Sequence, residues 1–233
     1  MKISGSVALV TGANRGLGAA FAQALLDRGA RTVYAAARNP ATITDTNLTP
    51  IELDVTDPAA VAAAAERCAD VDLLVNNAGI SRSGGSDPDS ARAEMDTNYF
   101  GTLSMSRAFA PVLARNGGGA LVNVLSVLSF ITLPQVSGYA ASKAAAWSLT
   151  NALRLELKEQ GTHVLGVHAG YIDTDMAAHV TGPKITPAEV VAQTLDALES
   201  GAYEVLADAI SRQSKAGLSG ELERLYPALA AGG

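Results

Sequence analysis

The sequence predicts a single α/β domain, 1–233, in which a doubly wound parallel sheet of seven strands is flanked by helices. Two observations support this fold class. Short apolar runs alternate with longer amphipathic stretches along nearly the whole chain, and glycine-rich or polar turns follow most of the apolar runs. At 233 residues and 48% hydrophobic composition, the chain can bury one large core. The expected strands lie at 7–10, 31–37, 50–55, 71–75, 120–125, 163–169 and 203–206.

The composition argues against several classes of function. A net charge of −6 and the absence of any run of Lys or Arg argue against a nucleic-acid partner or an anionic membrane surface. The single cysteine, Cys68, excludes an intramolecular disulfide and fits a reducing compartment. The three histidines lack metal-ligand spacing, and no apolar segment resembles a signal peptide or a membrane span. We therefore expect a cytoplasmic protein without a metal.

The first strand leads into a glycine-rich turn. The run at 7–10 precedes Thr11-Gly-Ala-Asn-Arg-Gly-Leu-Gly18, and an amphipathic stretch from 19 to 28 then stops at Gly29. Strand, glycine turn and helix form the setting that a dinucleotide pyrophosphate requires, because glycines admit the phosphates and the helix N-terminus supplies partial positive charge. A tight turn without a ligand is the structural alternative. The candidate contacts are Gly12, Asn14, Arg15, Gly16, Leu17 and Gly18.

Arg38 follows the second expected strand, about twenty residues after the last loop glycine. An acidic residue at this point binds the ribose 2′-hydroxyl of NAD, whereas an arginine suits the 2′-phosphate of NADP. Arg15 offers a second cation nearby. We therefore expect NADP(H) in preference to NAD(H), the alternative being two solvated surface arginines.

Two further strand ends are candidates for contacts with a nucleotide. Asp54 and Val55 end the third expected strand, where they could meet an adenine ring, and Asp57-Pro58 then starts a helix. The fourth strand ends in Asn76-Asn77-Ala78-Gly79, whose small and amide side chains could line a cofactor. From this segment we select Asn77, Ala78 and Gly79, and a tight turn is the alternative.

The second half of the chain carries the candidate chemistry. A helical region expected at 91–115 contains Asn98, the fifth strand feeds Ser126, and a helix expected at 139–160 opens with Tyr139 and Lys143. Side chains four residues apart lie on one helix face. A cation ~4 Å from the phenol contributes about 1 to 4 kcal/mol, which would lower the pKa of Tyr139 by about one to three units. Tyr and Lys at this spacing also occur by chance on many helices, so the other motifs decide.

The C-terminal third is expected to complete the sheet and to border a substrate. After the strand at 163–169 comes Gly170-Tyr-Ile-Asp-Thr-Asp-Met176, within a short substrate loop at 171–186. A helix at 187–199 and the last strand follow. The tail at 208–233 contains one amphipathic piece, 218–226, and ends loosely.

Together these residues resemble the short-chain dehydrogenase/reductase family, in its single-domain branch with a Rossmann fold. The likeness spans about 5–206. The loop at 11–18 resembles the family's TGxxxGxG, 76–79 its NNAG segment, and 169–176 its PGxIxTxM segment, with Ala169 in place of the proline. Asp54-Val55 resembles its adenine contact. The catalytic Asn-Ser-Tyr-Lys set of the family corresponds to Asn98, Ser126, Tyr139 and Lys143.

The resemblance implies a role for each of these residues. Tyr139 would donate a proton to a carbonyl oxygen, Ser126 would hydrogen-bond that oxygen, and Lys143 would lower the pKa of the tyrosine and bind the nicotinamide ribose. Asn98 would hold a water that relays protons to Lys143. Further cofactor contacts would come from Tyr139, Lys143, Gly170, Ile172 and Thr174. The resemblance also implies a homodimer or homotetramer that pairs the helices near 91–115 and 139–160.

We accordingly predict an NADPH-dependent carbonyl reductase or secondary-alcohol dehydrogenase. The candidate pocket is almost wholly apolar, which favours a neutral lipophilic ketone or alcohol as the small-molecule substrate. Its residues are Val127, Leu128, Phe130, Leu133, Val136, Tyr171 and Met176, several of which could instead be core. Alternatives are an NAD-dependent alcohol dehydrogenase of the same fold, a sugar epimerase, which would need a larger C-terminal domain, and a non-catalytic NADP-binding sensor or scaffold.

Overall fold

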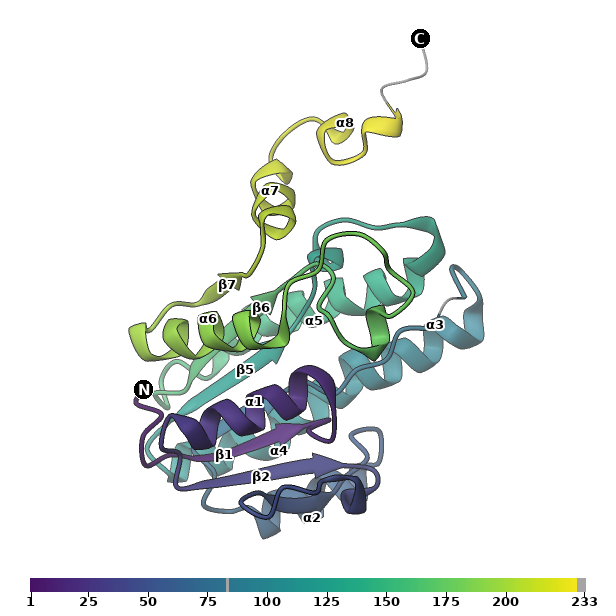
Figure 1. The fold of residues 1–233 in the computed structure, drawn as a ribbon. Helices are drawn as coiled ribbons and strands as arrows, with labels where there is room; N and C mark the ends of the chain where they lie inside the picture. Colours follow the sequence, from purple (N-terminus) through teal and green to yellow (C-terminus); the bar gives the residue numbers. More distant parts are fainter. Residues whose placement is uncertain (83, 230–233) are drawn as a thin grey trace.

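A computed structural model describes residues 1–82 and 84–229 of the chain. Its centre is a parallel sheet of seven strands in the order β3-β2-β1-β4-β5-β6-β7, which confirms the predicted fold class (Figure 1). The strands are β1 Val7–Thr11, β2 Thr32–Ala37, β3 Thr49–Glu52, β4 Leu73–Asn76, β5 Ala120–Val124, β6 His163–His168 and β7 Glu204–Leu206. The chain order reverses between β1 and β4, and ligands of doubly wound sheets bind beyond the strand ends at such a point.

Helices cover both faces of the sheet because successive strand residues point to opposite sides. In β1, Ala8 and Val10 join the core beneath α1 and α6, whereas Val7 and Leu9 join the core beneath α2, α4 and α5. The helices are α1 Gly16–Asp27, α2 Pro58–Arg67, α3 Pro88–Met95, α4 Thr102–Arg115, α5 Ser137–Glu156, α6 Pro187–Ser200, α7 Ala209–Gly217 and α8 Leu222–Leu225.

The structure departs from the predicted helices in two places. The single helix expected at 91–115 is instead α3 and α4 joined by a π-helical turn, Asp96–Gly101, that contains Asn98. The tail carries a helix that was not predicted, α7, whose N-cap is the side chain of Asp208. Figure 1 shows α7 and α8 continuing past β7, beyond the sheet. The amphipathic piece expected at 218–226 contributes only the short α8.

Position 83 and residues 230–233 of the expected tail lie outside the described residues. Within the ranges that the structure describes, no helix is long and apolar enough to cross a bilayer. The same ranges contain no group of three or more His, Cys, Asp or Glu side chains that could hold a metal ion.

Candidate active site

The glycine turn after β1 packs so closely on its surroundings that side chains would not fit. A Cβ atom at Gly18 would lie 2.1 Å from the carbonyl oxygen of Gly12 and 2.5 Å from the amide nitrogen of Asn77. Gly12 and Gly16 adopt positive φ angles of 65° and 54°. These are the positions at which only glycine permits both the backbone conformation and the close approach.

The turn leaves backbone donors for an anion. α1 begins at Gly16 without a side-chain cap, since Arg15 makes no capping hydrogen bond. The first N–H groups of a helix have no intrahelical partner, so they can donate to a pyrophosphate. Thr11 and Asn77 hold the turn against β4, because the amide of Asn77 donates to the carbonyl oxygen of Thr11 at 2.9 Å. This cradle fits a dinucleotide.

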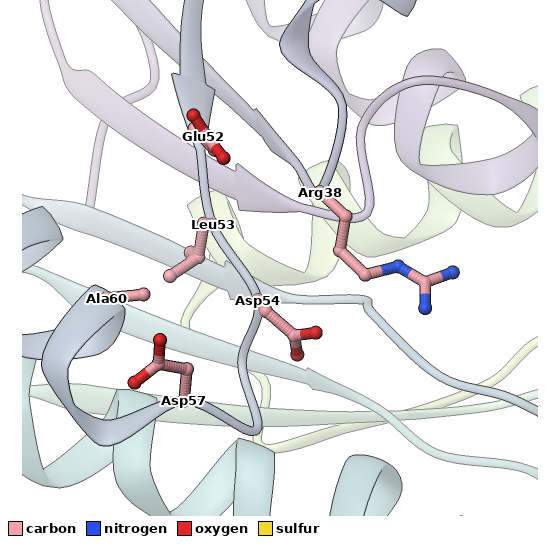
Figure 2. Close-up of a pocket in the computed structure, with 6 residues that line it drawn as sticks. All are labelled: Arg38, Glu52, Leu53, Asp54, Asp57 and Ala60. Atoms are coloured by element: carbon pink, nitrogen blue, oxygen red, sulfur yellow. The ribbon is translucent and has the colours of Figure 1, made fainter.

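A cavity of about 410 Å³ lies at the ends of β2 and β3. It is lined by Arg38, Glu52, Leu53, Asp54, Asp57 and Ala60. The side chains of Arg38 and Asp54 extend in the same direction in Figure 2, away from Asp57. Hydrogen bonds from Thr56 lower the pKa of Asp54, and the charge of Arg38 adds to that lowering. Asp54 lies beyond the end of β3, and the adjoining Val55 is buried. Arg38 therefore brings positive charge to this cavity.

Arg15 pairs with Asp175, although its sequence position suggested a place beside Arg38. Its guanidinium lies 3.4 Å from the carboxylate of Asp175, on the segment that follows β6. The next residue, Gly16, also meets this segment, because a Cβ there would lie 3.3 Å from the methyl group of Thr174. The two loops thus approach each other beside the glycine turn, and Arg38 is the cation that lines the cavity.

Tyr139, Lys143 and Ser126 converge where β5 meets α5. The ammonium of Lys143 lies 5.7 Å from the centroid of the Tyr139 ring and donates to the carbonyl oxygen of Val124 at 2.9 Å. Ser126 begins a tight turn, and its hydroxyl oxygen accepts from the backbone N–H of Leu128 at 3.1 Å. That bond uses a lone pair, so the hydroxyl proton remains free to be donated.

The expected lowering of the tyrosine pKa is wrong for the protein as it stands. Burial raises the pKa of Tyr139 to about 12, hydrogen bonding to Ser126 lowers it, and the charge of Glu94 adds to the rise. Burial also lowers the pKa of Lys143 to about 8. The physical reason is desolvation, which disfavours the charged form of each group.

Asn98 joins the NNAG segment to the helix of the tyrosine. Its carbonyl oxygen accepts from the backbone N–H of Ile80 at 2.8 Å, and its amide donates to Ile80 and to the hydroxyl of Ser142. A Cβ at Gly79 would lie 3.1 Å from the Asn98 oxygen and 3.6 Å from the Lys143 ammonium. Gly79 therefore leaves open the approach to both groups. π-helical turns of this kind occur often at functional sites.

The segment after β6 is held by two contacts that the sequence did not indicate. The backbone N–H of Gly170 donates to the carboxylate of Asp208 at 2.6 Å, and Ile172 pairs with Ile185 across the loop. Ala169, in place of the expected proline, is buried, and its carbonyl oxygen accepts from the backbone N–H of Val127. The strand pairing between β5 and β6 therefore continues to the site.

The expected substrate residues divide by exposure. Leu133, Tyr171 and Met176 are 41, 47 and 53% exposed, and Leu128 and Val136 are partly buried. Val127 and Phe130 are buried. The ring of Phe130 stacks on His168 with centroids 4.2 Å apart and meets Trp147 edge-on, so it packs in the core beneath the site.

Two buried polar residues near the site, Glu94 and His168, were not predicted from the sequence. Glu94 is 1% exposed, and its carboxylate accepts from the backbone N–H of Arg82 at 2.6 Å. His168 is fully buried between Ser126 and Glu204. The only indication of His168 in the sequence is its place as a histidine at the end of an otherwise apolar strand.

Comparisons with known proteins agree with this geometry. A family model for short chain dehydrogenases matches residues 6–184. The crystal structure of a short chain dehydrogenase from Burkholderia cenocepacia J2315 in complex with NADP matches with a TM-score of 0.93 and 46% identity, covering 98% of this chain and 99% of that chain.

Two curated relatives match over most of the chain. The 3-oxoacyl-(acyl-carrier-protein) reductase FabG of Salmonella typhimurium is 31% identical over 217 residues, which are 88% of each protein. Dehydrogenase/reductase SDR family member 7B of Bos taurus is 34% identical over 197 residues, which are 75% of this chain but only 60% of the bovine protein. The family model and these relatives show that the chain belongs to the short-chain dehydrogenase/reductase family of oxidoreductases.

Proposed function

We propose that this protein is an NADPH-dependent carbonyl reductase that acts on neutral, lipophilic ketones and, in reverse, on the corresponding secondary alcohols. The observation that carries the proposal is the convergence of Ser126, Tyr139 and Lys143 at the end of β5, next to Gly79 and the glycine turn. A proton donor, a second hydroxyl donor and a buried ammonium meet there at the edge of a dinucleotide cradle.

We assign NADP(H) to the cradle, and when bound it supplies the hydride for the carbonyl carbon. The turn of Gly12, Gly16 and Gly18 would hold the pyrophosphate, and Arg38 would face the 2′-phosphate. The NADP complex of the Burkholderia cenocepacia dehydrogenase supports this assignment, since that protein shares 46% of its sequence with this chain. The remaining contacts of the proposal are Asn14, Arg15, Leu17, Asp54, Val55, Asn77, Ala78, Gly79, Tyr139, Lys143, Gly170, Ile172 and Thr174.

The raised pKa of Tyr139 suits a proton donor in the reductive direction. At neutral pH a phenol with a pKa of about 12 keeps its proton, so it can give that proton to a carbonyl oxygen as negative charge develops there. Ser126 donates a second hydrogen bond to the same oxygen. Lys143 is largely protonated below its pKa of about 8, and its charge stabilises the phenolate as it forms.

The substrate preference follows from the apolar side chains around the cleft. Leu133, Tyr171 and Met176 expose apolar surface on the loops that border the site. In the substrate loop, the ammonium of Lys184 lies 3.0 Å from the carboxylate of Asp173, so its charge is already paired. An uncharged aryl or alkyl ketone therefore fits these surroundings better than a carboxylated or phosphorylated one. The ketone substrate in the name of the Salmonella reductase agrees with the reaction type.

The experiment is a ketone panel with NADPH and with NADH, followed by the absorbance of the reduced nicotinamide. Tyr139→Phe is the matched variant, and we expect it to lose on the order of 1,000-fold in kcat. Its Kd for NADPH should stay unchanged. NADPH binding without turnover of any panel member would favour the sensor alternative. Higher kcat/KM for small keto acids than for uncharged ketones would contradict the proposed pocket.

We also propose that the protein assembles as a homodimer or homotetramer through α4 and α5. Leu155 on α5 is 77% exposed, and Phe100, just before α4, is 50% exposed. Large apolar side chains of this kind are typical of interfaces. Light scattering should give a mass of two or four chains, and Leu155→Glu should reduce it. A monomeric wild type would contradict the proposal.

A further inference from the structure

The C-terminal tail is anchored to the segment that follows β6. Asp208, the residue before α7, is half-buried, and its carboxylate accepts two backbone hydrogen bonds. One oxygen accepts from the N–H of Ser211 at 2.9 Å and so caps α7, and the other accepts from the N–H of Gly170 at 2.6 Å. A single side chain therefore ties the helix of the tail to a residue 38 positions earlier in the chain.

Gly170 lies in close contact with the tail. A Cβ atom at this position would lie 2.9 Å from the Cγ2 atom of Ile210 and 3.0 Å from the carboxylate of Asp208, so a larger residue would have to displace one of them. Among the described residues, the N–H of Gly170 has no acceptor other than Asp208. Loss of the only partner of a half-buried N–H costs free energy, so this bond favours one position of the segment.

The segment reaches from the tail to the glycine turn. It starts beside the turn of Ser126, where the carbonyl oxygen of Ala169 accepts from the N–H of Val127 at 2.8 Å. It ends beside α1, where a Cβ atom at Gly16 would lie 3.3 Å from the methyl group of Thr174. Because the segment is short, a displacement of its first residues would also move the backbone beside the dinucleotide cradle.

The tail has a second attachment, to the segment that follows Ser126. α7 packs against the turn Val127–Ser129. Further along the tail, the hydroxyl oxygen of Tyr226 accepts from the backbone N–H of Thr132 at 3.1 Å. The tail thus bridges the two segments from which most of the proposed substrate residues come, and the bond between Asp208 and Gly170 is its link to one of them.

We propose that Asp208 is a positioning residue, whose carboxylate holds Gly170 against α7 and so fixes the backbone at 170–174 where the nicotinamide of NADP(H) would bind. The proposal rests on the cofactor contacts proposed above for Gly170, Ile172 and Thr174. It gives the tail a role in the reaction, because hydride transfer requires the nicotinamide and the carbonyl carbon to meet in a narrow range of distance and angle. Asp208 acts through the segment and does not itself touch the reacting atoms.

Two substitutions separate the two bonds of Asp208. In Asp208→Ser the hydroxyl oxygen can still cap α7, because serine is a favoured N-cap, but no second oxygen is left for Gly170. In Asp208→Ala both bonds are lost. We expect both variants to lose kcat on the order of 10-fold at saturating NADPH, whereas only Asp208→Ala should unfold at a clearly lower temperature. Wild-type kcat in Asp208→Ser would mean that Asp208 only caps α7, and the proposal would fall.

Asp87→Ser is the matched control. Asp87 also caps a helix, α3, where its carboxylate accepts from the N–H of Ser90 at 2.8 Å. The substitution is the same and again leaves an oxygen for the cap, but it removes no bond to the segment after β6. We expect the kcat of wild type. A loss equal to that of Asp208→Ser would contradict the proposal, because it would follow from changing a capping aspartate in general.

A second measurement needs no turnover. Hydrogen exchange of the NADPH complex, read by mass spectrometry, reports separately on residues 170–176 and on α7. We expect 170–176 to exchange faster in Asp208→Ser than in wild type, and α7 to exchange alike in the two proteins. Equal exchange at 170–176, or a change confined to α7, would overturn the proposal. If the wild type bound NADPH but reduced no ketone, the proposed function would fail while this measurement still decided the role of Asp208.

Discussion

The ammonium of Lys143 lies 5.7 Å from the ring centroid of Tyr139 and donates to the carbonyl oxygen of Val124 at 2.9 Å. Lys143 therefore links α5 to the end of β5 while it is only 5% exposed. Burial of a cation costs stability, and here it lowers the pKa of Lys143 to about 8. A site that needs this charge must tolerate the cost, as is common where activity and stability compete.

The first prediction concerns the pH dependence of that cost. Below pH 8 both folded and unfolded chains hold the Lys143 proton, and the folded state bears the full penalty. Between about pH 8 and 10 the folded state releases the proton first, so stability rises with pH. From about pH 7 to 9.5, wild type should gain about 2 kcal/mol in unfolding free energy relative to Lys143→Met, measured with urea.

Lys158→Met is the control for this measurement, because Lys158 is exposed just after the same helix. Its difference from wild type should stay constant over the same range. A constant difference for Lys143→Met as well would show that the buried ammonium does not carry the penalty.

A second prediction concerns cofactor preference. Arg38→Asp should place negative charge at the cavity where we assign the 2′-phosphate and remove a charge-assisted hydrogen bond of about 1.5–3 kcal/mol. The ratio of kcat/KM for NADPH over NADH should fall about 10- to 100-fold. Arg31→Asp makes the same charge change at the opposite end of β2 and should leave the ratio unchanged. Equal effects of the two substitutions on this ratio would contradict the assignment of Arg38 to the 2′-phosphate.

A third prediction tests the glycine cradle. The Cβ atom of Gly18→Ala would lie 2.1 Å from the carbonyl oxygen of Gly12, so the turn must move away from its helix. We expect a loss of stability of about 1–3 kcal/mol and at least a 10-fold weaker Kd for NADPH, measured by thermal unfolding and by fluorescence titration. Gly182→Ala is the control, because a Cβ there meets nothing within 4 Å and its φ is not positive. A Gly18→Ala protein with normal NADPH affinity would contradict the assignment.

The strands of the sheet were predictable because each one is marked by its own short segment of sequence. Strands buried on both faces read as continuous apolar runs, so the observed ends at Thr11, Ala37 and Asn76 lie within one residue of the expected ones. The turn residues then follow at the same edge, since parallel strands all end on one side. For the same reason Ser126, Tyr139 and Lys143 could be brought together from sequence alone.

The features that could not be predicted from the sequence depend on burial or on contacts between residues far apart in the chain. α7 has a polar sequence, but Asp208 caps it and also binds Gly170, 38 residues earlier. The pKa of Tyr139 could not be predicted from its spacing to Lys143, because burial of the phenol is the largest influence on it. Lys215 and His168 meet through Glu204, which lies on a strand of three residues. The ion pair between Arg15 and Asp175 joins two loops 160 residues apart.

A final prediction concerns acid stability and the same carboxylate. Because the pKa of Glu204 in the folded protein is about 2, its contribution is complete above the unfolded value of about 4.3 and is lost as pH falls toward 2. Glu204→Gln should therefore cost about 1–2 kcal/mol at neutral pH, a figure reduced for partial solvent screening. The gap from wild type should shrink between about pH 5 and 2.5, as followed by urea unfolding at each pH. Glu223→Gln, which replaces an exposed carboxylate on α8, serves as the control. If the difference in unfolding free energy between Glu204→Gln and wild type stayed constant down to the lowest pH, contacts with His168 and Lys215 would not be stabilising the ionised carboxylate.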